Sequence, residues 1–491
     1  MAIAVCLLAG HATSAQSPTS VGPYVAVTDR VPYPEPALPA LGPAGSRFTD
    51  PVFKSEITRI TDGTTRPGHL NYSFRTTSSP HQNEWSAKGS YFYLMSNGGS
   101  VIPYRFDAAT GSASRINPTA TGDGGLVLLT YVEPQFSYVD DAIIYLAYSG
   151  SGTNDRTLDT YDFSTGLYTP LVNLDTIVTG LSGTYIGGIA SSAGATERVE
   201  TFFGGTSQDH HHYVLVFDRT TPSNRLLLDT WASTLNGQPT PITLNFSLHH
   251  VAIDRSGRYV MLYTTAADQS SARQAPQSVL WDTQTGAFFN MVLAVHPMGH
   301  DAFGYGVNVN KDCCTTTAWD AGQWQFRSLA SPAVTRDLLP ILLSPKETYL
   351  TDHTSWNNAS PTALLPVISA TFRYGTNTTP WRALDNEIFA IQTDAPGQNP
   401  TIWRFAHHRS DVSYDGNPSA VSFWYEPRPN VSDDGKWVLF TSNWEKTLGT
   451  DPKGEAGTGS RQDVFLLALT QANATPLPAS PTNVHIIRSG S

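Results

Sequence analysis

A short motif, an apolar strand that ends in aspartate and is followed by a tight turn, recurs along this chain of 491 residues. Its copies are YRFDAATG, DTYDFSTG, LVFDRTTPSN, VLWDTQTG and FAIQTDAPG, with the aspartates at Asp107, Asp162, Asp218, Asp282 and Asp394. The first four aspartates are 55, 56 and 64 residues apart. In each turn we expect the carboxylate to accept backbone N–H bonds and glycine to take positive φ. Such a repeat requires a fold built from similar units.

Matching strand pairs joined by polar turns accompany these motifs: NEWSAKGSYFYLMS, FSYVDDAIIYLAYS, VAIDRSGRYVMLYT and PNVSDDGKWVLFTS. Degenerate copies lie at 185–228, 300–338 and 353–398. The pattern predicts seven four-stranded antiparallel units. Units of this kind arranged radially form a β-propeller. We therefore predict an all-β, seven-bladed β-propeller over residues 56–491, a single domain.

Segments outside the seven units have simpler predicted roles. EITRITDG at 56–63 and NVHIIRS at 483–489 both read as outer strands, and we expect one of them to close the ring. Residues 16–55, which contain VPYPEPALPALGPAG, are predicted to form a Pro-rich arm on the surface. The polar insertion at 445–463 is predicted to be a surface loop.

Charge and the N-terminus restrict the partners and the location. The formal net charge is −11, from 41 acidic and 30 basic residues, so the chain has no general basic surface for nucleic acid. Residues 1–15 resemble a secretory signal peptide without its basic region; the alternative is a frayed N-terminus. No later segment has the roughly 20 apolar residues of a membrane helix. We predict a secreted or periplasmic monomer with no membrane insertion.

The adjacent cysteines Cys313 and Cys314 rule out a disulfide framework. They could form a vicinal disulfide, bind a soft metal or remain buried thiols. The sequence leaves these three states open.

The segment SDDGKWVLFTSNW resembles the WD40-like repeats of TolB-type periplasmic proteins, and EPRPNVSDDGKWVLFTSNWEKT resembles the last blade of oligogalacturonate lyases. The resemblance is close over about 20 residues and architectural elsewhere. It implies a seven-bladed propeller that cleaves pectic oligosaccharides by β-elimination. Pro427, Arg428 and Pro429 occupy the position where that family has a metal-binding His-Pro-His pair. Because Arg428 is charged where a ligand would be neutral, the family's metal site is not transferred to this chain.

Histidines stand at the predicted starts of inner strands, where a propeller places side chains at one mouth of its channel. They are His81, His249, His250, His300, His353, His407 and His408. Four of them, His250, His300, His353 and His408, are 50, 53 and 55 residues apart. At equivalent blade positions they could hold a divalent metal such as Ca, Mn or Zn, or supply a base beside a sugar. The alternative is that each histidine bonds a turn of the neighbouring blade.

The groups around these histidines suit an acidic sugar. Elimination at a uronate needs a neutralised carboxylate, a base for the C5 proton and an acid for the leaving oxygen. The predicted catalytic residues are His408, His353, Tyr425 and Arg409. The predicted substrate-binding residues are His81, Arg75, Arg428, Trp356 and Tyr305. The arginines could instead pair with Asp301, Asp411 or Glu426, and Asp301 with Asp352 could form a glycosidase pair.

These observations predict a secreted polysaccharide lyase that acts on an acidic polysaccharide or oligosaccharide. One alternative is a non-catalytic binding propeller of the TolB type. The other is a metal oxygenase, because carotenoid-cleaving oxygenases are seven-bladed propellers in which four histidines hold iron.

Overall fold

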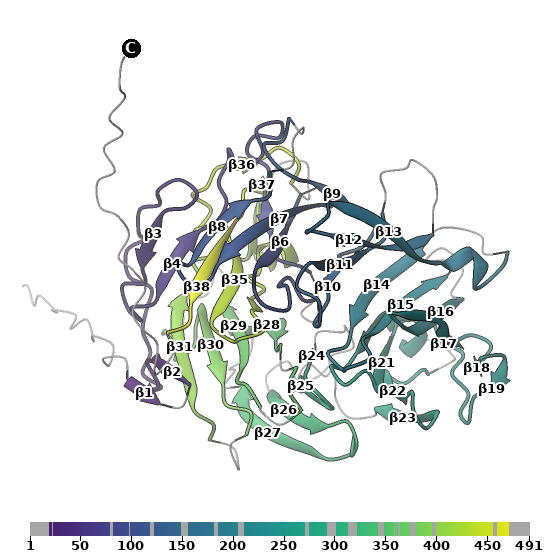
Figure 1. Ribbon diagram of the computed structural model, residues 1–491. Coiled ribbons are helices and arrows are strands. Elements are labelled where there is room, and N and C mark those ends of the chain that lie inside the picture. Colours follow the sequence, from purple (N-terminus) through teal and green to yellow (C-terminus); the bar gives the residue numbers. More distant parts are fainter. Residues whose placement is uncertain are drawn as a thin grey trace, which may run out of the picture.

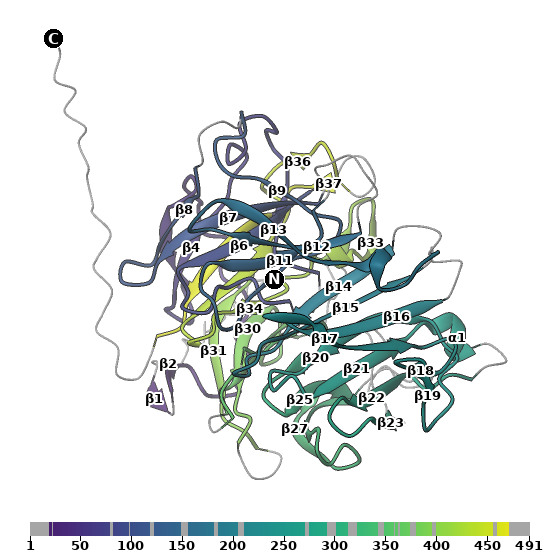
Figure 2. The same ribbon diagram turned by 45° about the vertical axis from the view of Figure 1, so that its right-hand side comes forward.

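A computed structural model describes residues 19–470, except for 22, 79–81, 98, 118–121, 149–155, 181–184, 205–210, 271–273, 292–300, 313–321, 342–347, 358, 362–363, 374–379, 395–398 and 455–458. The described residues form seven large sheets that follow one another around the molecule in chain order (Figures 1 and 2). The predicted all-β, seven-bladed propeller is confirmed. Cys313 and Cys314 lie outside the described residues.

The first three blades run from the innermost strand outward. Blade 1 comprises β5 (Phe74–Arg75), β6 (Tyr91–Ser96), β7 (Ser100–Asp107) and β8 (Ser112–Arg115), with β9 (Leu128–Leu129) beside β7. Blade 2 comprises β10 (Gln135–Phe136), β11 (Ile143–Leu146), β12 (Thr157–Asp162) and β13 (Leu167–Asn173), followed by the 3-10 turn η1 (Leu174–Thr176). Blade 3 comprises β14 (Tyr185–Ser191), β15 (Arg198–Gly204), β16 (His212–Asp218) and β17 (Thr221–Asp229), extended by β18 (Thr234–Leu235) and β19 (Gln238–Pro239).

The remaining blades repeat this order. Blade 4 comprises β20 (Leu248–Ile253), β21 (Tyr259–Thr264), β22 (Ser278–Asp282) and β23 (Ala287–Met291), with the short helix α1 (Ala266–Ser270). Blade 5 comprises β24 (Ala302–Phe303), β25 (Val307–Asp312), β26 (Gly322–Ser328) and β27 (Thr335–Ile341). Blade 6 comprises β28 (Thr348–Ser355), β29 (Val367–Arg373), β30 (Glu387–Ile391) and β31 (Ile402–His407). Blade 7 comprises β34 (Asn430–Val431), β35 (Trp437–Ser442), β38 (Asp463–Ala468), β4 (Glu56–Arg59) and β3 (Arg47–Thr49).

Blade 7 closes the ring with strands from both ends of the chain. β4 pairs antiparallel with β38, with Ile57 opposite Leu467 and Arg59 opposite Phe465. Figure 1 shows the yellow β38 beside the purple β4. The guanidinium of Arg59 also forms a buried ion pair with Asp463. The expectation that 56–63 could supply the closing outer strand is therefore confirmed.

Three of the five recurring aspartates hold the outer turns as predicted. Asp107 accepts an N–H bond from Ala109 at 3.0 Å, and Asp162 accepts one from Ser164 at 2.7 Å. Asp282 does the same with Gln284 at 3.0 Å, and Gly286 in this turn has a φ of 71°. A left-handed φ suits glycine because it has no Cβ.

The core lies between the blades, because adjacent sheets pack face to face. β6, β21 and β35 are buried along their whole length. They read YFYLMS, YVMLYT and WVLFTS, rich in the aromatic and β-branched residues that suit a pleated sheet. Each large apolar side chain buried this way contributes about 1.5–3 kcal/mol.

The remaining elements lie around the blades. They are β1 (Thr19–Val21) and β2 (Tyr24–Ala26), β32 (Ser413–Tyr414) and β33 (Asn417–Val421), β36 (Thr450–Asp451) and β37 (Gly459–Ser460), and the 3-10 turn η2 (Phe423–Tyr425). Val27 bridges Arg404 on β31, so this part of the N-terminal arm covers the outer edge of blade 6. In the described part of the chain, no helix has the length and apolarity to cross a membrane.

Candidate functional site

The predicted histidines occupy different positions in their blades. His250 lies on β20 and His353 on β28, the first strands of blades 4 and 6. These first strands contact one another around the ring, as β14 does with β20 and β28 with β34. His408 instead follows β31, the outermost strand of blade 6. The prediction that His408 begins an inner strand is therefore wrong, because a long loop separates it from β34. His81 and His300 lie outside the described residues.

His408 is fully buried, and both of its ring nitrogens are used in hydrogen bonds. Ser410 donates its backbone N–H to Nδ1 at 3.0 Å, so Nε2–H donates to the carbonyl of Thr371 at 2.7 Å. Burial lowers the pKa of His408 to about 3. His408 is thus a neutral structural residue, as the alternative interpretation holds. Its neighbour His407 bonds the carbonyl of Tyr33 in the N-terminal arm, at 2.9 Å.

Three more predicted site residues lie away from the mouth of the channel or serve the packing of the fold. Arg409 is buried and donates to the carbonyl of Pro36 at 2.8 Å and to Glu445 at 3.0 Å. Trp356 is buried and donates its indole N–H to the carbonyl of Leu365 at 2.8 Å. Tyr305 lies in the turn between β24 and β25, at the opposite end of its inner strand. The prediction of substrate contacts at the mouth is not supported for these side chains.

Of the possible glycosidase pair Asp301 and Asp352, the structure describes only the side chain of Asp301. Asp301 is buried and accepts a hydrogen bond from Asn308 Nδ2 at 2.9 Å. Burial raises the pKa of Asp301 to about 6. The side chain of Asp352 lies outside the described part of the chain.

Six side chains from the inner strands of blades 1 and 6 and from the loop before blade 7 lie close together, and we call them the mouth cluster: Arg75, His353, Phe423, Trp424, Glu426 and Arg428. Nε2 of His353 lies 3.6 Å from Oε2 of Glu426. Its ring packs on Phe423, with centroids 5.3 Å apart. The structure therefore brings His353, Arg75 and Arg428, three of the predicted site residues, into one cluster.

Trp424 joins the two arginines of the mouth cluster. The Cζ of Arg75 lies 4.1 Å from the centroid of the Trp424 ring, and that of Arg428 lies 5.3 Å from it. Guanidinium groups are attracted to the negative face of an indole ring. Trp424 thus allows two cations to lie near each other at the mouth.

Arg428 is a buried cation with unused hydrogen-bonding capacity. Its side chain is 1% exposed, and Nη2 donates to the carbonyl of Trp424 at 3.1 Å. Among the described residues, Nε and Nη1 have no hydrogen-bond partner. Burial lowers the pKa of Arg428 to about 10, and Arg75 adds to this effect. A guanidinium fork in this state suits a carboxylate.

The backbone of Arg428 is strained. Between Pro427 and Pro429, Arg428 has a φ of 38°, which a residue with a Cβ rarely adopts. Strain of this kind persists where the surroundings fix it and is frequent at binding sites.

Two carboxylates near Arg428 were not identified from the sequence. Glu84 is fully buried, and its Oε1 accepts the N–H of Thr77 at 2.5 Å. Its Oε2 has no partner within the described part, and burial raises the pKa of Glu84 well above its ordinary value. Glu133 accepts the N–H of Ser78 at 2.8 Å. The sequence offered one signal, and only for Glu84: in NEWS a charged residue stands directly before a tryptophan in a predicted strand pair.

Tyr425 is held as a neutral phenol. Its hydroxyl donates to Asp415 at 2.5 Å and accepts the N–H of Ser460 at 2.8 Å. Burial raises the pKa of Tyr425, and the hydrogen bond to Asp415 raises it further. Its proton is therefore already committed to Asp415.

Hydrogen bonds cross the channel on the inner side of the mouth cluster. Asn357 Nδ2 donates to Asn83 Oδ1 at 3.2 Å, and the hydroxyl of Tyr138 donates to Asn357 Oδ1 at 3.3 Å. These contacts join blades 6, 1 and 2 across the axis. A ligand would therefore reach the mouth cluster from the face on which the inner strands begin.

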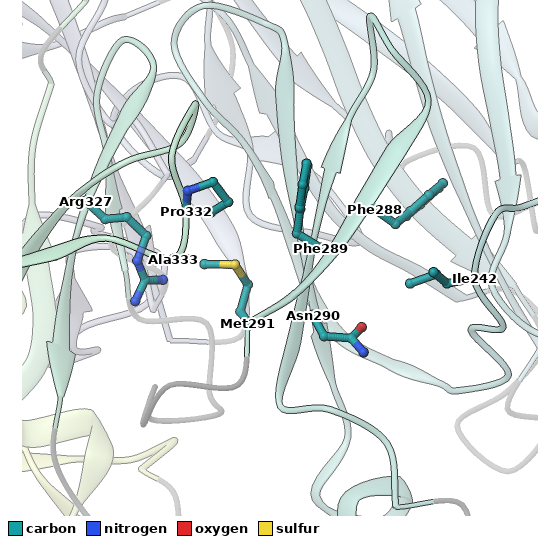
Figure 3. A pocket seen from close by; sticks show the side chains of 8 residues that line it. All are labelled: Ile242, Phe288, Phe289, Asn290, Met291, Arg327, Pro332 and Ala333. Atoms are coloured by element: carbon teal, nitrogen blue, oxygen red, sulfur yellow. The ribbon is translucent and has the colours of Figure 1, made fainter.

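A cavity of about 510 Å³ lies elsewhere, between outer parts of blades 4 and 5 (Figure 3). Figure 3 shows Phe288, Phe289 and Ile242 on one side, and Met291, Pro332 and Arg327 on the other. The walls are mainly apolar, whereas a sugar needs several polar partners. This cavity is a poorer match to a glycan than the mouth cluster.

The donor set at the mouth does not fit the predicted divalent metal. The part of the chain that the structure describes contains no group of three or more His, Cys, Asp or Glu side chains able to hold a metal ion. His353 and Glu426 supply two donors, and Arg428 lies beside them as a cation. The described members of the four-histidine set do not form the arrangement that an iron oxygenase would need.

No protein-family model matches the sequence, and no curated protein sequence matches it. Solved structures do. One similar structure is an oligogalacturonate lyase in complex with manganese, at 12% identity, with a TM-score of 0.54 over 87% of this chain and 98% of that one. Another is an oligogalacturonate lyase from Vibrio parahaemolyticus, at 12% identity, with a TM-score of 0.54 over 86% of this chain and 96% of that one. The chain thus shares the seven-bladed propeller fold of these lyases.

Proposed function

We propose that this protein is a secreted polysaccharide lyase that cleaves an acidic, uronate-containing oligosaccharide by β-elimination at the mouth cluster. One observation supports this most strongly: the buried Arg428, whose Nε and Nη1 have no hydrogen-bond partner among the described residues, lies in the same cluster as a histidine paired with a carboxylate. The shared fold with two oligogalacturonate lyases agrees with the proposal. The signal peptide at residues 1–15 is part of it and lies outside the described residues.

In the proposed reaction, Arg428 binds the carboxylate of the reacting uronate. Neutralising that charge makes the C5 proton more acidic. His353 takes the proton, and Glu426 stabilises the imidazolium that forms. The C5–H electron pair becomes the C4=C5 double bond as the C4–O bond breaks. Glu84, whose pKa burial raises well above its ordinary value, is the group near Arg428 that we assign to protonating the leaving oxygen.

The manganese in one similar structure suggests a divalent ion, and Ca, Mn or Zn was the expectation from the histidines. We propose instead that guanidinium groups neutralise the carboxylate here. The described donors are too few for an ion, and the charge of Arg428 opposes one.

The test uses a panel of uronate polysaccharides and follows the absorbance of the unsaturated product. We expect product with at least one substrate, and a loss of at least 100-fold in kcat/KM, about 2.7 kcal/mol, for His353→Ala. Arg428→Gln should lose a similar factor, and Arg428→Lys less, because lysine keeps the charge but not the planar fork. The control is Arg105→Gln, an exposed arginine that lies over Tyr91. No product across the panel would refute the proposal.

A binding propeller is the second candidate. It is favoured by the burial of His353 and Arg428, both 1% exposed, since Phe423 or Trp424 must shift before a substrate can reach them. In that case Arg428→Gln weakens binding of an oligouronate in calorimetry, while no unsaturated product forms.

A further inference from the structure

A pocket of about 200 Å³ lies next to the mouth cluster, between blades 7 and 1. Blade 1 contributes Arg75 and Asn97, and the loop before blade 7 contributes Trp424 and Tyr425. The insertion between β35 and β38 contributes Asp451 and Ser460. The pocket therefore shares Arg75 and Trp424 with the mouth cluster, and the two spaces are adjacent.

The insertion is anchored to blade 1 at this pocket. Asp451 is buried, and Oδ2 accepts the N–H of Ser73 at 3.0 Å and the Nδ2–H of Asn97 at 2.8 Å. Ser460 is fixed on the other side by Asp415, which accepts its N–H at 2.6 Å. Because these bonds join the insertion to blade 1 and to the turn between β32 and β33, the wall of the pocket is preorganised for binding.

Arg75 is the cationic group of the pocket. It is half-buried, and its guanidinium packs on Trp424 as described above. The ring restricts the long arginine side chain, so less conformational entropy is lost when the fork binds an anion. The lining also includes the half-buried Asn97 and Ser460, whose side-chain oxygens can accept hydrogen bonds from sugar hydroxyl groups.

We propose that this pocket is a subsite that binds a second uronate unit of the same acidic oligosaccharide, with Arg75 contacting its carboxylate. Trp424 acts as a positioning residue, because it holds Arg75 over the pocket. The inference rests on the proposed function for the identity of the ligand. It makes Asp451 and Ser460 of the insertion part of the binding site, and it predicts tighter binding of substrates that carry a second uronate unit.

The experiment measures KM and kcat with oligouronates of increasing length for the wild type, Arg75→Gln and Trp424→Ala. We expect Arg75→Gln to raise KM about tenfold on the longer substrates, equivalent to about 1.4 kcal/mol, with the smaller effect on kcat. Trp424→Ala should raise KM in the same direction. Arg105→Gln is the matched control, since it removes a guanidinium that lies 5.3 Å from the ring of Tyr91, outside the pocket. Thermal unfolding of each variant shows whether it is folded, and Arg75→Gln decides the result if Trp424→Ala is not.

Calorimetry with the inactive His353→Ala protein separates this inference from the proposed function. If the wild type forms no product but binds an oligouronate through Arg75, the subsite stands and the enzyme is refuted. If product forms and KM does not depend on Arg75 at any chain length, the subsite is overturned while the enzyme stands. If neither product nor binding is found, both are overturned.

Discussion

His353 and His408 are both buried histidines of blade 6, but their ring nitrogens face different groups. His408 bonds the chain itself on both sides, through Ser410 and Thr371. His353 lies beside Glu426 and Phe423 in the mouth cluster. A histidine whose two nitrogens are both bonded to backbone stabilises the fold and has no free atom for chemistry. The role of a buried histidine in this protein therefore depends on its hydrogen-bond partners and cannot be read from the residue type alone.

Replacing His408 by glutamine should therefore reduce stability in a pH-dependent way. At pH 7.5 we expect a loss of about 1–3 kcal/mol in the free energy of unfolding, because a buried hydrogen-bonded group is replaced. The folded-state pKa of His408 is about 3, below its usual 6.5, so the unfolded state binds more protons as pH falls through this window. The free energy of unfolding of the wild type therefore falls between pH 7.5 and pH 5 through His408, whereas the variant has no such contribution because glutamine does not titrate.

Urea unfolding of both proteins at pH 7.5 and pH 5 measures this difference. The gap between wild type and His408→Gln should be smaller at pH 5. An equal gap at both values would mean that His408 is not held neutral in the fold.

Among the elements, the outer strands and their turns follow closely from the sequence, and the loops do not. The Asp turn at Asp282 and the pairing of β4 were predicted, because turn chemistry and strand patterning are local. The loop after His408 was missed. Because of this loop, the first strand of blade 7 begins only at Asn430. The loop also contains η2, which places Phe423 and Trp424 in the mouth cluster. The regular spacing of the histidines could not reveal this loop, because an inserted loop changes the number of residues between strands but leaves the sequence pattern of each strand unchanged.

The same limit applies to the candidate site. Arg75, His353 and Arg428 were predicted at the mouth because each lies at or near the start of an inner strand. Glu84 and Glu133 could not be placed there, since their contacts depend on how the blades meet. Contacts between elements distant in the sequence are set by the packing of the whole ring.

The closing strand should contribute strongly to stability. Ile57 on β4 is 1% exposed and packs in the core between blades 6 and 7. We expect Ile57→Ala to reduce the free energy of unfolding by about 2–5 kcal/mol, the range for buried large-to-small changes. Leu70→Ala is the control, because Leu70 is 55% exposed and its loss should change stability by less than about 0.5 kcal/mol. Chemical denaturation of both variants measures the comparison, and equal effects would contradict a role for β4 in the core.

The whole molecule shares its architecture with oligogalacturonate lyases at 12% identity, so its fold and its chemistry are separate questions. A propeller presents whatever side chains its inner strands begin with. Here two arginines and a histidine–glutamate pair occupy one mouth, in a protein whose net charge is −11. The proposed acidic ligand would therefore depend on these two guanidinium groups, because the overall field of the protein repels it.

Removing divalent ions should leave the activity unchanged. We expect protein dialysed against a chelator to retain its rate on the preferred uronate substrate within about twofold, because the proposed carboxylate partner is Arg428. Adding back Mn, Ca or Zn should not raise the rate. Loss of activity on chelation and its recovery with one ion would show that a metal, rather than a guanidinium, neutralises the substrate.

The pairing of β4 with β38 also has a consequence for biosynthesis. These partners are about 400 residues apart, so the ring stays open until the ribosome has made nearly the whole chain. A nascent polypeptide that cannot complete this sheet stays short of its native state until β38 has been made. The synthesis of β38 would then set the moment at which the polypeptide becomes resistant to proteolysis.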